Sequence, residues 1–175
     1  MYTTPKEIPE GYCQITCGRC ACCSPLADVL KREGLNEFAW ALSLAGLGGD
    51  AAEPGWMMVA LAPTDGALRS FLAAKGWASR EAVEADASAK AYVAELARAH
   101  LLPPLPDTRA VWTTPFFLPG TEAATLQGRK VRVAARDGDT PTLAGASGAQ
   151  ARVTKADVYA CKGYVNVLDG VLAHA

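Results

Sequence analysis

The chain has 175 residues, of which 50% are hydrophobic and 20% charged, and its formal net charge is −1. Its 17 basic residues are scattered among 18 acidic ones, which excludes the clustered positive surface that nucleic-acid binding requires. No apolar run reaches the roughly 20 residues that span a bilayer, so we expect no transmembrane segment. The first residues lack the apolar core of a signal peptide, which leaves either a cytosolic protein or a mature chain without its leader.

The cysteines favour a secreted protein. Five of the six lie within residues 13–23, and an even number concentrated in this way predicts disulfides formed in an oxidising compartment. If all six are oxidised, at least one clustered cysteine pairs with the distant one. The predicted disulfide cysteines are Cys13, Cys17, Cys20, Cys22, Cys23 and Cys161. A redox motif at Cys17 and Cys20 and a zinc site in the cluster are the alternatives.

Helical patterns dominate the first half of the chain. Residues 1–23 form a polar arm without periodicity, and Ser24-Pro25 begins a helix that ends at Gly34. A second helix follows and ends at Gly46 or at Gly48–Gly49. Residues 56–62 are an apolar run that predicts a buried strand. The next helix begins at Thr64 or Asp65, and a further helical stretch runs from Ser79 to the Pro103-Pro104 break.

The second half changes to short segments rich in Val, Thr and aromatic residues, separated by glycine turns. We expect strands over residues 109–113, 122–126, 130–135, 151–153 and 164–168. Helices first and strands later predict an α+β protein with N-terminal helices packed on an antiparallel β-sheet wedge or sandwich. We expect two parts, a Cys-rich arm over residues 1–23 and a domain over residues 24–175.

Four segments, in order, resemble the signatures of the fasciclin domain family. They are residues 58–68 (MVALAPTDGAL), 99–103 (AHLLP), 125–130 (TLQGRK) and 164–172 (YVNVLDGVL). The resemblance implies a fasciclin-like fold and a non-catalytic extracellular module in cell adhesion or in matrix or cell-wall assembly, with a protein or glycan partner. The N-terminal arm is similar to Cys-rich modules of green-algal secreted proteins.

The resemblance also implies partner-binding residues. Asp157 and Val158 fall where adhesive members carry an Asp-Ile pair implicated in integrin-type recognition, where an exposed carboxylate can complete a partner's metal coordination. His100 lies in a region of the family linked to partner binding, although Ala99 replaces the usual aromatic residue. The alternatives are a turn before the last strand for Asp157 and a core position for His100.

An apolar patch is predicted around the Thr114-Pro115 break, because proline prevents successive residues there from all pointing inward. Its residues are Trp112, Phe116, Phe117 and Leu118. Such a patch is typical of an interface or an apolar-ligand groove. Because some algal family members bind carotenoids, the second function hypothesis is a carotenoid or lipid held near this patch and His100. The alternative for the patch itself is ordinary packing of the loop over the sheet. Asp65 and Asp169 are interpreted as cap and turn residues, and we identify no catalytic or metal-binding set.

Overall fold

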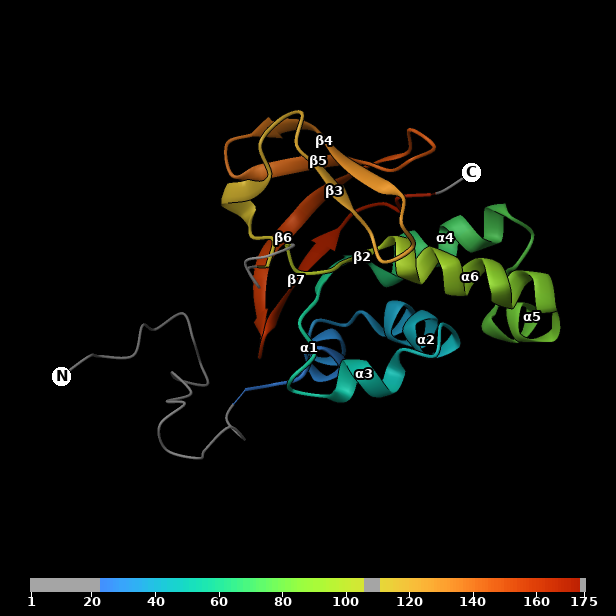
Figure 1. Ribbon diagram of the computed structural model, residues 1–175. Helices are drawn as coiled ribbons and strands as arrows, with labels where there is room; N and C mark the ends of the chain where they lie inside the picture. Colours follow the sequence, from blue (N-terminus) through green and yellow to red (C-terminus); the bar gives the residue numbers. More distant parts are fainter. Residues whose placement is uncertain (1–22, 106–110, 174–175) are drawn as a thin grey trace.

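The computed structural model describes residues 23–105 and 111–173, and it contains a helical layer and a curved sheet (Figure 1). The helices are α1 (Leu26–Arg32), α2 (Asn36–Leu44), α3 (Gly48–Ala52), α4 (Asp65–Ala74), α5 (Arg80–Ala85), α6 (Ala87–Ala99) and the 3-10 helix η3 (Thr114–Phe116). The strands are β1 (Val59–Pro63), β2 (Leu101–Leu102), β3 (Glu122–Ala124), β4 (Lys130–Asp137), β5 (Thr140–Ala144), β6 (Gln150–Ala160) and β7 (Gly163–Leu168).

The strands form one seven-stranded sheet in the order β2-β1-β7-β6-β5-β4-β3. All neighbours are antiparallel except β1 and β7, which run parallel. The sheet curls until its two ends approach each other, and the backbone N–H of Leu126 donates to the carbonyl of Leu101 at 2.8 Å. The α+β prediction is therefore confirmed, in the form of a barrel-like sheet with helices packed against one part of it.

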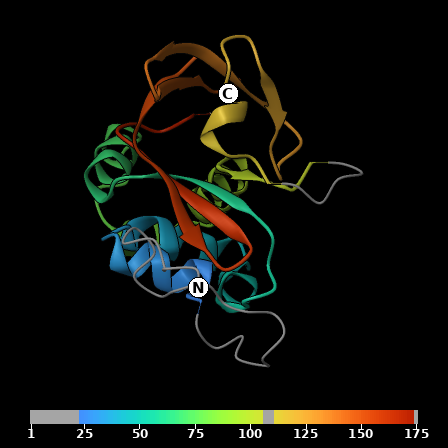
Figure 2. The ribbon, with the colours of Figure 1, turned by 90° about the vertical axis from the view of Figure 1, so that its left-hand side faces the viewer.

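Strands β1 and β7 separate two apolar cores. In β1, Ala60 and Ala62 face the helices, whereas Val59 and Leu61 face the interior of the curled sheet. The helical core includes Phe38 and many buried leucines, valines and alanines of α1, α2, α4 and α6. Figure 2 shows α1–α3 at one end of the molecule and the yellow η3 turn at the other, beside the curled part of the sheet.

Local capping explains where two predicted helices begin. The Thr64 hydroxyl accepts a hydrogen bond from the Ala67 N–H at the start of α4, and the Ser79 hydroxyl caps α5 in the same way. Asp65 does something different, because its carboxylate accepts from the Glu37 N–H at 2.8 Å, in the first turn of α2. The two residues of the predicted cap therefore bond to different helices, Thr64 to α4 and Asp65 to α2.

Several predicted elements differ from the structure. Residues 111–113 are not a strand, and the other two residues of that prediction lie outside the described ranges. Strand β5 was missed because Pro141 suggests a break. At Pro141 the strand pairs with β4 but not with β6, so the N–H that proline lacks is not needed for pairing with β6. Helix α3 begins at Gly48, a residue interpreted as a terminator. The parallel pairing of β1 with β7 departs from the expected antiparallel sheet.

Candidate functional site

Two segments that the sequence singled out separately are in contact. Asp157 lies within β6, not in a turn, at a position where the register with β7 shifts and the backbone has φ 51°. Both carboxylate oxygens of Asp157 accept from the Thr114 N–H, at 3.1 and 2.9 Å. Asp157 therefore holds the start of η3 in the segment of residues 112–118, which we call the η3 loop.

The backbone of Asp157 is fixed from the opposite side. Its N–H donates to the side-chain oxygen of Asn166 at 2.9 Å, and Asn166 is fully buried in β7. A φ of 51° is in the left-handed region, which aspartate and asparagine tolerate better than most other residues. The bulge and the Asn166 contact thus direct the Asp157 side chain toward the η3 loop.

Arg136 holds the same loop by donating hydrogen bonds to carbonyl groups of the loop backbone. Its guanidinium donates to the carbonyls of Thr114 at 3.1 Å and Phe117 at 3.4 Å, and also to Gly138 in the turn after β4. Asp139 accepts a further bond from this group at 3.3 Å. No sequence pattern pointed to Arg136, whereas Asn166, a polar residue inside the apolar segment YVNVL, was a visible signal that was missed.

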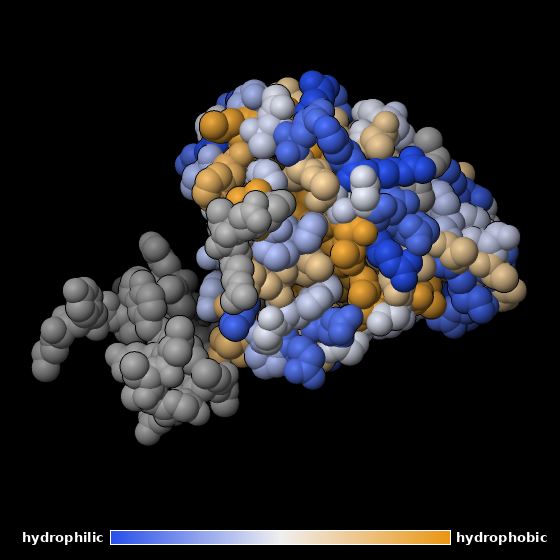
Figure 3. All heavy atoms as spheres, viewed as in Figure 1, coloured by the Kyte–Doolittle hydropathy of each residue, from blue (hydrophilic) through white to orange (hydrophobic). Residues whose placement is uncertain are grey.

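The four residues of the predicted patch divide into two pairs. Phe117 is 2% exposed and stacks on Trp112, with ring centroids 6.2 Å apart, and both pack on the core inside the sheet. Phe116 and Leu118 are 49% and 56% exposed. As expected around the proline break, the four side chains therefore do not all point inward. Figure 3 shows apolar side chains on the face drawn in Figure 1 in small groups between hydrophilic ones.

His100 and Val158 do not contribute an exposed side chain to this site. His100 is fully buried; its Nε2 accepts from the Leu172 N–H at 3.0 Å, so the proton is on Nδ1, which donates to the Leu96 carbonyl at 2.9 Å. The partner contact expected at His100 has no surface in this structure through which to form. Val158 is half-buried and packs against the helical core.

The predicted link between the N-terminal cysteines and the last strands is present. Cys23 and Cys161 form a disulfide with a Cα–Cα distance of 5.0 Å, which joins the segment that leads into α1 to the turn between β6 and β7. The predicted pairings of Cys13, Cys17, Cys20 and Cys22 lie outside the described residues. Within residues 23–105 and 111–173, no three His, Cys, Asp or Glu side chains are grouped to hold a metal ion.

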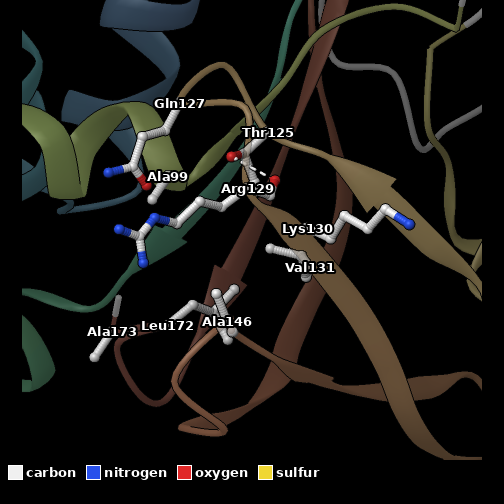
Figure 4. A pocket seen from close by; sticks show the side chains of 10 residues that line it. Ala99, Thr125, Gln127, Arg129, Lys130, Val131, Ala146, Leu172 and Ala173 are labelled. Atoms are coloured by element: carbon white, nitrogen blue, oxygen red, sulfur yellow. Dashed lines mark hydrogen bonds between the residues drawn. The ribbon is translucent and has the colours of Figure 1, made fainter. Parts of the chain in front are cut away.

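The cavities found in the described part of the chain are small. One has a volume of about 10 Å³ and lies between the hairpin of residues 125–131, the loop at Ala146 and the segment ending at Ala173 (Figure 4). The Gln127 side-chain oxygen is buried there without a hydrogen-bond partner in the described residues. A second, beside His100 and Phe38, has no measurable volume. The first is large enough for a single water molecule only.

Comparison with known proteins supports the resemblance. The family model of the Fasciclin domain matches residues 33–174. A solved structure of a FAS1 domain pair from the insect cell adhesion molecule Fasciclin I is similar, with a TM-score of 0.53 and 18% sequence identity, over 81% of this chain and 46% of that one. The chain thus spans about half the length of that structure, and the likeness concerns the fold alone. No curated protein matches the sequence. Of the described helices, none is long and apolar enough to cross a membrane.

Proposed function

Because the chain belongs to the fasciclin domain family, whose members are extracellular adhesion-related modules, we propose that it is a non-catalytic interaction domain in cell adhesion or in matrix or cell-wall assembly. Its partner is a protein or a glycan at the cell surface or in the matrix. Secretion is consistent with the Cys23–Cys161 disulfide, because such bonds persist mainly in oxidising compartments.

One observation carries the proposed location of the contact. Phe116 and Leu118 are the two most exposed large hydrophobic side chains of the described residues, and both lie on the η3 loop. The loop backbone is held by Asp157 and Arg136. Exposed apolar side chains on a fixed backbone bind with a small loss of conformational entropy, which is the property of residues that dominate an interface.

A small apolar ligand, such as a carotenoid or lipid, is the second candidate. Exposed Phe116 and Leu118 beside the stacked pair of Trp112 and Phe117 favour it. A ligand pocket usually encloses about 300–1,000 Å³, whereas the larger cavity described above has a volume of about 10 Å³. Such a ligand would therefore lie on the surface of the η3 loop, in contact with Phe116 and Leu118.

The test compares an F116A/L118A double variant with L126A. Leu126 is 36% exposed and lies in the turn after β3, outside the η3 loop, so its substitution controls for the loss of an exposed apolar side chain elsewhere on the surface. Each immobilised protein is exposed to a native extracellular extract, and bound proteins and glycans are identified and titrated. We expect the double variant to lose at least about tenfold in affinity for a partner that L126A retains.

Two results would contradict this reading. A partner bound equally by the unaltered protein, the F116A/L118A variant and L126A would place the contact elsewhere. A visible absorption band or lipid that accompanies the purified protein and is lost in the double variant alone would favour the apolar-ligand function.

A further inference from the structure

We propose that Asp157 is a positioning residue, whose carboxylate holds the η3 loop and does not complete the metal coordination of a partner. As far as it concerns recognition, this inference rests on the proposed function. It predicts that the loop keeps its conformation, and Phe116 and Leu118 keep their presentation, without a divalent cation.

The Asp157 carboxylate is already engaged within the domain. Both of its oxygens lie within 3.1 Å of the Thr114 nitrogen, and the side chain is only partly exposed. The backbone is fixed by the bond from its N–H to Asn166, so the side chain can turn outward only by giving up its bonds to the Thr114 N–H. A carboxylate that completes a partner's metal site must instead present an oxygen to solvent.

Asp157 is one of two side chains that hold the same peptide segment. Asp157 of β6 holds the N–H of Thr114, and Arg136 of β4 holds the carbonyl of the same residue. Strand β5 lies between these two strands in the sheet, so the η3 loop is fastened across three strands. Charged groups that satisfy both a buried donor and a buried acceptor fix a backbone more firmly than neutral ones do.

The bonds to Thr114 also position the aromatic residues that come after it. Phe116 and Phe117 follow Thr114 after the single residue Pro115, and their N–H groups donate to the carbonyls of Thr113 and Thr114, respectively. One consequence is that Phe117 turns into the core while Phe116 points outward. Loss of the Asp157 bond would release the start of η3. The arrangement with Phe117 in the core and Phe116 outside would then no longer be held.

Three substitutions of Asp157 separate the contributions of its charge, its hydrogen-bond acceptor and its backbone conformation. Asp157→Asn removes the charge and keeps an oxygen that can accept from Thr114, and asparagine tolerates the left-handed backbone. Asp157→Gly keeps the backbone conformation and removes the acceptor. Asp157→Ala removes the acceptor and also strains the backbone. A comparison of the glycine and alanine variants therefore isolates the backbone effect.

The measurement is hydrogen exchange of the η3 loop amides in the full chain, followed by NMR or mass spectrometry, in EDTA and in calcium chloride. We expect the glycine and alanine variants to exchange these amides at least about tenfold faster than the unaltered protein, and the asparagine variant to stay within about threefold of it. Calcium should leave exchange in the unaltered protein unchanged.

Two outcomes would overturn the proposal: loop exchange in D157G equal to that in the unaltered protein, or a calcium-dependent change in the unaltered protein that D157N and D157G both lack. The experiment uses no partner. Its failure is therefore independent of the F116A/L118A binding test, and each proposal can fail alone.

Discussion

Removal of the Cys23–Cys161 disulfide should destabilise the protein strongly. The two cysteines are 138 residues apart, so the bond closes nearly the whole described chain into one loop. In the chain-entropy model, a loop of this length stabilises the folded state by about 5 kcal/mol through restriction of the unfolded chain. Domains of this size have a total stability of about 5–15 kcal/mol, so the bond accounts for a large share.

The perturbation is the double substitution C23S/C161S, because a single change would leave one thiol free to pair with a neighbouring cysteine. Cys161 has φ 43° in the turn between β6 and β7, where serine is strained and asparagine is tolerated. A matched C23S/C161N variant therefore removes the bond without this strain. The difference in free energy of unfolding between the two variants measures the strain of serine in the turn. The loss of free energy that both variants share measures the contribution of the disulfide.

The assay is urea denaturation, with thermal unfolding beside it. We expect a loss of about 4–5 kcal/mol for C23S/C161N and a fall in Tm of about 10–20 °C. The m value should increase, because the unfolded chain without the bond exposes more surface. A loss below about 1 kcal/mol with an unchanged m value would refute the reasoning, since it would mean that the bond does not restrict the unfolded chain.

Three further substitutions test single features. His100→Ala should lower the free energy of unfolding by about 3 kcal/mol, because it removes a buried ring and two hydrogen bonds; a loss under about 1 kcal/mol in urea denaturation would contradict this. Gly163→Ala should prevent stable folding, because a Cβ would overlap the backbone carbonyl of Met58; a circular dichroism melt equal to that of the unaltered protein would disprove it. Lys130 lowers the pKa of Glu122, first through its hydrogen bond and second through its charge. Any stability from this pair is therefore present above the pKa that Glu122 has in the unfolded chain, and it is lost as the pH falls through the lower pKa of the folded state. Lys130→Met should therefore raise that pKa in an NMR titration, and an unchanged value would mean that the pair does not form.

The parts of the fold that depend on nearby residues could be predicted. Thr64 and Ser79 begin helices through hydrogen bonds to residues three positions later, a signal contained in a few letters of sequence. The parallel pairing of β1 with β7 joins Val59 to Tyr164, and no local pattern records a partner so far away. Strand β5 was hidden by Pro141, because the effect of proline depends on which side of the strand is paired.

The site was predicted as separate pieces. Asp157 and the η3 loop both attracted attention, but their contact spans 43 residues and depends on a bulge in β6 that sequence patterns do not reveal. The role foreseen for Asp157 was that of an exposed acid, because the family resemblance places it where adhesive members carry an Asp-Ile pair. Burial of His100 follows from the packing of α6 against β1 and the C-terminal segment, which is again a long-range property.

The meeting of the two ends of the sheet also limits how a partner can attach. The terminal strands β2 and β3 have 2 and 3 residues, and the Leu126–Leu101 hydrogen bond occupies part of the space between them. Within the described chain, these ends offer little unpaired backbone to an incoming extended peptide, so neither β-strand addition nor edge-to-edge fibre growth has a long template here. A partner that binds the ends of this sheet would therefore contact side chains more than free backbone groups, and the sheet itself gives little template for polymerisation.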